Sequence, residues 1–163
     1  MKLIAIDPGY ERLGIAVIEK TPQSQRGSGK ETLVYSDCFK TDKALPHNER
    51  LGLVAAELDR VIDEFAPAAL CLETLFFSVN QKTAIKVAEV RGVILAAAAK
   101  HDLKVYEYGP GQIKVAVTGY GKSDKAQVMS MIPRLIRITK PIKHDDEYDA
   151  IAVGLTCFAT ERF

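Results

Sequence analysis

The sequence has no tryptophan, three cysteines and no apolar run long enough to cross a membrane. A spanning helix needs about 20 apolar residues, and the longest candidate, residues 93–99, is far shorter. Cys38, Cys71 and Cys157 are odd in number, widely spaced and set in apolar surroundings, which predicts reduced core thiols and no zinc site. The chain opens directly on an apolar strand without a signal peptide. We therefore expect a cytoplasmic protein with no membrane partner.

A marked excess of either charge is also missing, because 22 basic and 21 acidic side chains leave a net charge of +1. The balance is uneven along the chain: between residues 100 and 143 there are nine Lys or Arg and three Asp or Glu. That segment is basic enough to meet a polyanion, with a solvated basic face as the alternative. A length of 163 residues with 47% hydrophobic residues predicts a single domain over residues 1–163.

The first 18 residues predict a β-hairpin that carries a carboxylate at its bend. Residues 3–6 (LIAI) form a short apolar run typical of a buried strand, and Asp7 stands at its end. A Pro-Gly pair then breaks the strand, and residues 13–18 resume the apolar pattern. Asp7 could simply cap the turn. Whether it has a functional role instead depends on the other acidic residues of the chain.

Further carboxylates occupy matching places. Glu73 directly follows a second apolar run at residues 69–72, and Asp146 and Asp149 are spaced to share one face at the start of a helix. If the two strands are neighbours and the helix packs across them, Asp7 joins the other three acids. Like charges at one point raise one another's pKa and need a positive counterpart. A divalent cation with oxygen ligands is the obvious candidate.

The rest of the chain alternates strands and helices. Residue 123 is expected to cap one of these helices, and Pro133 to kink it or to shift its end. The order predicts an α/β fold: a five-stranded mixed sheet, made of an antiparallel meander plus parallel strands, with helices on both faces and the first and fourth strands adjacent. The expected ranges are a loop at 21–30, strands at 31–39, 69–73 and 103–108, and helices at 47–65, 80–100, 112–117 and 124–138, with a last helix after residue 144.

Four stretches, IDPGYERLGIAV, LETLFFSVN, QIKVAVTGYGKSDKAQV and DEYDAIAVGLT, together resemble the RuvC family of bacterial Holliday-junction resolvases, the crossover junction endodeoxyribonucleases. The resemblance covers nearly the whole chain in the right order. It implies a ribonuclease-H-like fold, a homodimer, and cutting of four-way junction DNA with Mg²⁺ or Mn²⁺ during recombination and repair. It also implies partners of the branch-migration machinery, proteins of the RuvA and RuvB type.

The resemblance also implies roles for particular residues. Two metal ions per active site, about 3.5–4 Å apart, would activate a water and stabilise the leaving 3′ oxygen. Phe76 matches the aromatic that stacks at the junction centre, and Lys114 and Lys125 match lysines that contact DNA. The implied catalytic and metal-binding carboxylates are Asp7, Glu73, Asp146 and Asp149.

The acidic stretch near the C-terminus departs from the family pattern. The two residues between the last aspartates are usually small in the family, whereas Glu147 and Tyr148 stand there. Asp145 shares a helix face with Asp149 and could take the place of Asp146, whose spacing matches the family. His144 adjoins these acids and is a candidate accessory group.

Three other functions compete with junction resolution. An RNA-processing nuclease of the same fold would cut a different structured substrate. A non-catalytic junction-binding protein would use the acids only as caps and solvated charges, which the intact acidic set argues against. An actin-like phosphotransferase also begins with a hairpin bearing an Asp, but it needs a second, duplicated half for which 163 residues leave no room.

Overall fold

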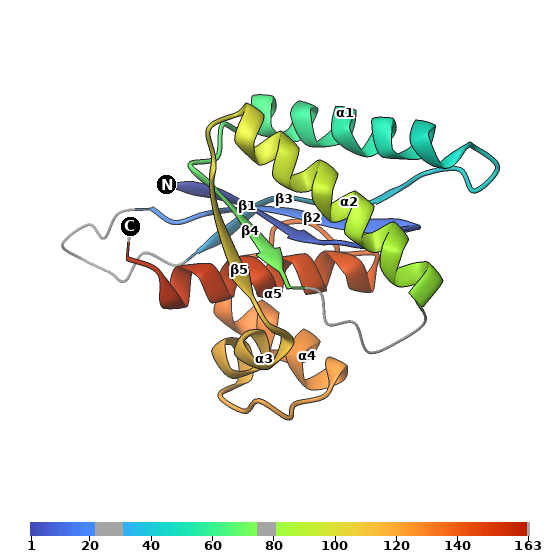
Figure 1. Ribbon diagram of the computed structural model, residues 1–163. Helices are drawn as coiled ribbons and strands as arrows, with labels where there is room; N and C mark the ends of the chain where they lie inside the picture. The colour runs from blue at the N-terminus through green and yellow to red at the C-terminus, as the bar shows by residue number, and fades with distance from the viewer. Residues whose placement is uncertain (22–30, 75–80, 163) are drawn as a thin grey trace.

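A five-stranded sheet forms the centre of the computed structural model, which describes residues 1–21, 31–74 and 81–162 (Figure 1). Helices cover both faces of this sheet, as the sequence predicts. The strands are β1 (Lys2–Asp7), β2 (Arg12–Glu19), β3 (Thr32–Lys40), β4 (Ala69–Glu73) and β5 (Lys104–Tyr108). The helices are α1 (His47–Phe65), α2 (Gln81–Lys100), α3 (Pro110–Thr118), α4 (Lys125–Leu135) and α5 (Asp145–Thr160).

The strand order is β3-β2-β1-β4-β5, which confirms that the first and fourth strands are neighbours. β1 pairs antiparallel with β2 and parallel with β4. The helical crossover through α1 explains the parallel pairing, because a hairpin turn can join only antiparallel strands. The two central strands therefore end at the same edge of the sheet.

Each face of the sheet has its own apolar core (Figure 1). α1 and α2 pack on the face lined by Ile4 and Ile6, while α5 packs on the face lined by Leu3 and Ala5. This alternation follows from the period of two along a strand. α3 and α4 lie beyond α5, on the side away from α1 and α2.

The start of α5 approaches β2 so closely that no side chain fits between them. A Cβ on Gly14 would lie 2.2 Å from the carbonyl oxygen of Asp146 and 3.2 Å from Cβ of Asp7. Gly14 is also the partner of Asp7 in the β1–β2 ladder. The missing side chain thus lets the first turn of α5 sit directly beside the end of β1.

Two local details differ from the sequence prediction. α4 ends at Leu135, two residues after Pro133, because the backbone of Arg137 then pairs with that of Glu31 and Leu33. The cap of this helix is Asp124, whose side chain accepts from the backbone N–H of residue 127. The loop expected at 21–30 lies, beyond its first residue, outside the described residues.

The three cysteines are buried and free, which confirms the prediction of reduced core thiols. No helix among the described residues is long and apolar enough to cross a membrane.

Candidate active site

Two acidic side chains end the two central strands. Ile6 pairs with Leu72 in the parallel ladder, so Asp7 and Glu73 follow at the same edge of the sheet. Both continue the face of Ala5, because strand residues alternate between faces. That face is covered by α5. The predicted convergence of the strand-end acids is therefore observed.

The first turn of α5 brings two more carboxylates to this edge. Asp146 and Asp149 lie there, and every residue from Ala150 to Phe158 is buried. The apolar remainder of the helix anchors it against the sheet, while the partial positive charge of a helix N-terminus favours acidic side chains in the first turn. Burial of one end thus fixes the position of the acids at the other.

The four carboxylates interact electrostatically. Burial and the charges of Glu73, Asp149 and Asp146, in that order, raise the pKa of Asp7 to about 8. Burial followed by the charge of Asp149 raises the pKa of Glu73, and burial raises that of Asp149 against the lowering effect of Lys125. Such shifts are expected where acidic groups gather in a partly buried place, and they are frequent in functional sites.

Two cations of the chain itself contact these acids. Lys125 Nζ donates hydrogen bonds to Asp145 Oδ2 at 2.6 Å and to Asp149 Oδ2 at 2.7 Å. Burial alone would lower the pKa of Lys125, but these two hydrogen bonds raise it. Arg12 Nη1 lies 3.2 Å from Asp146 Oδ2 and 3.7 Å from Asp145 Oδ1. Part of the negative charge is thus balanced by two side chains of the protein itself.

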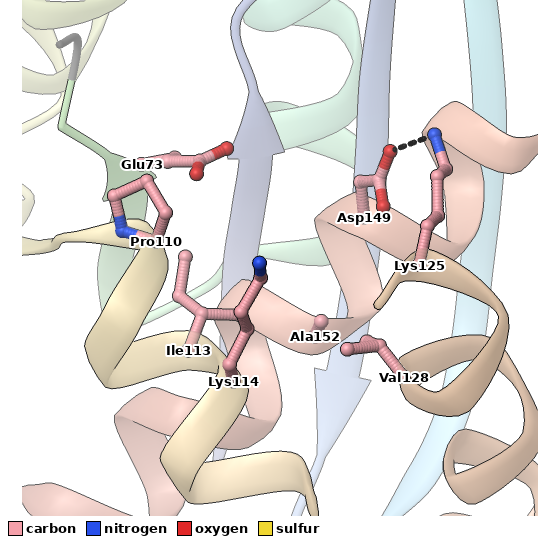
Figure 2. A pocket seen from close by; sticks show the side chains of 8 residues that line it. All are labelled: Glu73, Pro110, Ile113, Lys114, Lys125, Val128, Asp149 and Ala152. Atoms are coloured by element: carbon pink, nitrogen blue, oxygen red, sulfur yellow. Dashed lines mark hydrogen bonds and ion pairs between the residues drawn. The ribbon is translucent and has the colours of Figure 1, made fainter. Parts of the chain in front are cut away.

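A cavity of about 240 Å³ opens beside the carboxylates (Figure 2). Glu73 and Asp149 extend from opposite sides of it, and Lys125 is bonded to Asp149. The structure places both predicted DNA-contacting lysines on this cavity. Its lining residues are Glu73, Pro110, Ile113, Lys114, Lys125, Val128, Asp149 and Ala152.

The donor set fits a hard divalent cation, since it consists of carboxylate oxygens, and burial together with their mutual repulsion raises the pKa of Asp7. Within residues 1–21, 31–74 and 81–162, no three His, Cys, Asp or Glu side chains are close enough as placed to hold an ion. The hydrogen bond from Lys125 to Asp149 is one physical reason for this spacing of the acids, because it engages one of the candidate metal ligands. A metal ion would therefore compete with Lys125 for Asp149.

The geometry separates the two candidates for the third ligand. The side chain of Asp145 is 44% exposed and that of Asp146 17% exposed. The charge of Asp146 acts on Asp7, and Cys38 Sγ donates to Asp146 Oδ2 at 3.4 Å. Asp145 instead binds Lys125, which lowers its pKa to about 2. These contacts favour Asp146.

Glu147 and His144, which neighbour these acids in the sequence, make their contacts away from the carboxylate site. Glu147 is only 3% exposed and accepts hydrogen bonds from Ser36 Oγ and from the backbone N–H groups of Lys143 and His144. The side chain of His144 lies 3.3 Å from Lys40 Nζ. Glu147 therefore secures the start of α5, and nothing in this position of His144 supports a role on the acids.

Sequence reasoning missed Arg12 and Cys38, which both contact Asp146. Arg12 lies five residues after Asp7, across the turn, and that short spacing was an available signal. Cys38 gave none, because it reaches the site only through the pairing of β3 with β2. Phe76 lies outside the described residues, so its predicted place at the junction centre stays a prediction.

Comparisons with a family model, with related sequences and with solved structures all point to the same family. Residues 3–157 match the family model described as crossover junction endodeoxyribonuclease RuvC. A protein of that name from Thermosipho melanesiensis is 44% identical over 99% of this chain and 98% of its own. The Thermus thermophilus RuvC structure superposes with a TM-score of 0.87 at 31% identity, covering 98% of this chain and 94% of the other. The T. thermophilus RuvC in complex with Holliday junction substrate gives 0.85 at 30% identity, with the same coverage.

Proposed function

Since the chain belongs to the RuvC family of crossover junction endodeoxyribonucleases, we propose that it resolves four-way DNA junctions by paired hydrolysis of backbone phosphodiesters. The observation that carries this proposal is the convergence of four acids from β1, β4 and α5 beside a cavity with two lysines. The protein is thus a nuclease that acts in DNA recombination and repair.

Divalent metal dependence follows from the family. We propose that Asp7, Glu73, Asp146 and Asp149 hold Mg²⁺, with Mn²⁺ as an alternative, at two ions per active site. When bound, such ions act as Lewis acids on the phosphate and lower the pKa of a bound water. The donor set supports this assignment, because four neighbouring carboxylates need cationic neutralisation.

The other side chains position the substrate. Lys114 and Lys125 line the cavity with Glu73 and Asp149, so a DNA strand held by them has its phosphates beside the acids. Contacts of this kind orient the backbone without reading its bases. Gly14 and Glu147 act indirectly, because they fix the start of α5 against the sheet.

We further propose a homodimer of single-domain chains, each spanning residues 1–163. α2 supports it: this helix buries Val90 and Ile94 against the sheet but exposes an opposite face of mostly small residues. That face consists of Ile85, Ala88, Gly92, Ala96 and Ala99. A twofold dimer supplies two active sites, which matches the symmetry of a four-way junction. Branch-migration proteins of the RuvA and RuvB type are the proposed partners, in the cytoplasm.

A cleavage assay tests the proposed function. Purified protein is incubated with a four-way junction, a linear duplex and a structured RNA, each with and without Mg²⁺. We expect symmetric nicks in the junction alone, and only with metal.

Asp7→Asn should abolish cutting while junction binding persists, because it removes one ligand and keeps the shape of the side chain. Cutting of RNA in preference to the junction would instead identify an RNA-processing nuclease.

A further inference from the structure

The connection between α3 and α4, two helices that each contribute a lysine to the cavity, exposes an aromatic side chain. Its segment 119–124 joins the helix of Lys114 to the helix of Lys125. Tyr120 in this segment is 59% exposed and Val115 on α3 is 53% exposed. The segment folds back onto α3, because a Cβ on Gly121 would lie 3.3 Å from Val115 Cγ2. Val115 and the segment that carries Tyr120 therefore lie against each other.

The backbone of Tyr120 is held firmly although its side chain is exposed. Its N–H donates to Thr118 Oγ1 at 3.1 Å, and its carbonyl oxygen accepts from Ser123 N–H at 3.2 Å and from Ser123 Oγ at 2.8 Å. The two hydroxyl groups also bond to each other at 2.7 Å, and Ser123 is only 3% exposed. Gly119 makes the turn possible with a φ of 77°.

This arrangement suits a binding contact. A tyrosine has only two side-chain torsions, so an aromatic ring on a fixed backbone loses little conformational entropy when a ligand covers it. The hydrogen bonds of Thr118 and Ser123 thus hold the backbone of Tyr120, while most of the residue stays exposed to solvent.

The surrounding charge identifies the ligand class. Lys122 adjoins Tyr120, and Lys114 and Lys125 lie on the helices that the segment joins. Among the described residues, Lys114 and Lys122 form no ion pair. An aromatic platform flanked by lysines is the combination that binds a nucleic acid strand. A specific protein partner would require roughly 800 Å² on this chain, far more than two side chains provide.

We propose that Tyr120, supported by Val115, forms an apolar contact with one nucleotide of the DNA strand whose phosphates lie along Lys114 and Lys125. The contact rests on the proposed function and adds a nucleotide-binding position outside the carboxylate site. The ring meets the apolar face of a base or of a deoxyribose, and the experiment below separates these two.

Binding measurements on a Tyr120 series test the contact. Junction affinity is measured for Tyr120→Ala and Tyr120→Phe in an Asp7→Asn background, which prevents cutting. We expect the alanine variant to bind about 10-fold more weakly, equivalent to about 1.4 kcal/mol, and the phenylalanine variant to stay within about twofold of the parent. Leu53→Ala is the matched control, because Leu53 is an exposed apolar residue, 42% exposed, on α1 across the sheet.

A fluorescent variant adds a direct readout. The chain has no tryptophan, so Tyr120→Trp introduces a single indole at this position. We expect its emission to be quenched by bound junction. A scan of abasic sites through the strand separates the two ligands: loss of quenching at one site identifies a stacked base, and quenching that survives every site identifies a deoxyribose.

Two results would overturn the contact: equal junction affinity of Tyr120→Ala and the parent, or an unchanged emission of Tyr120→Trp at saturating DNA. An equal loss in Leu53→Ala would do so as well, because the effect would then be unspecific. Failure of the proposed function looks different. A parent protein that neither cuts junctions nor prefers them over linear duplex refutes junction resolution, while the Tyr120 series measured on duplex still decides the contact.

Discussion

Lys125 Nζ donates a hydrogen bond to Asp149 Oδ2 at 2.7 Å, in the site where we propose that a metal ion binds. A lysine and a divalent cation compete for that carboxylate oxygen, because each carries a positive charge and repels the other. Asp145 offers Lys125 a second partner at 2.6 Å, so the lysine can release Asp149 and still remain paired. Part of the negative charge of the site is thus balanced by Lys125, a side chain that the family resemblance assigns to DNA.

Lys125→Met is predicted to separate metal affinity from activity. Loss of the competing positive charge should tighten Mn²⁺ binding by about 10-fold, the order expected for one nearby charge in a partly exposed site. Junction cleavage should fall, because a phosphate contact is lost. Mn²⁺ binding is measured by calorimetry without DNA, with Lys122→Met as the control. Weaker Mn²⁺ binding in Lys125→Met would contradict competition at Asp149.

Asp146→Asn and Asp145→Asn are predicted to differ sharply. The charge of Asp146 acts on Asp7, whereas the side chain of Asp145 is 44% exposed and bound to Lys125. We expect Asp146→Asn to reduce the cleavage rate at least 100-fold, or about 2.7 kcal/mol, and Asp145→Asn to stay within about 10-fold. Single-turnover cleavage at saturating Mg²⁺ measures both. The reverse order would assign the third ligand to Asp145.

Asp7→Asn is predicted to stabilise the metal-free protein in a pH-dependent manner. Burial and the neighbouring carboxylates raise the pKa of Asp7 in the fold to about 8, from its ordinary value of 3.8. Between these two values the folded state keeps a proton that the unfolded state loses, so the wild type loses stability as the pH rises from about 4 to about 8. The asparagine does not titrate and escapes this loss.

The free energy of unfolding is measured in EDTA at pH 4.5 and pH 8.5. We expect the two proteins to have similar free energies of unfolding at pH 4.5. At pH 8.5 that of Asp7→Asn should be higher by more than about 1 kcal/mol, since one pKa unit is worth about 1.4 kcal/mol. A difference that does not change with pH would mean that Asp7 is not electrostatically strained.

Glu147→Gln is predicted to destabilise the fold by about 1–3 kcal/mol, because an amide NH₂ would face the donors that now bond to a buried carboxylate. Burial alone would raise the pKa of Glu147, but hydrogen bonds from Ser36, Lys143 and His144 lower it. This stabilisation is present above the unfolded pKa of about 4.5 and is lost as the pH falls through the folded value.

The measurement is urea unfolding at pH 7 and at pH 3.5, with exposed Glu49→Gln as the control. The difference between Glu147→Gln and wild type should shrink at the lower pH. An equal difference at both values would mean that packing, and not the charge, is what Glu147 contributes.

Phe76→Ala is predicted to weaken junction cleavage by about 10-fold, within the range of 1–3 kcal/mol for a stacked base. Thermal stability should be nearly unchanged, as is usual for a surface residue. Melting and cleavage are measured together, with Phe77→Ala as the matched control. A large drop in melting temperature with normal activity per folded molecule would show that Phe76 belongs to the core.

The order of elements and the edge at which the acids gather follow from the sequence alone. Apolar residues repeat every two or every three to four positions, and this periodicity depends only on local geometry. Asp7 and Glu73 end apolar runs, and a helical crossover makes those strands parallel, so their ends meet without knowledge of any contact. A spacing of three places Asp146 and Asp149 together in the same way.

The balance of charge within the site required the tertiary structure. The bonds of Lys125 to Asp149, of Cys38 to Asp146 and of Ser36 to Glu147 join residues 24, 108 and 111 positions apart. The same acidic run thus holds one exposed carboxylate, one that acts on Asp7 and one that anchors the helix. Neighbouring acids look alike in a sequence, and only packing decides which is buried, which meets a cation and which meets a backbone N–H.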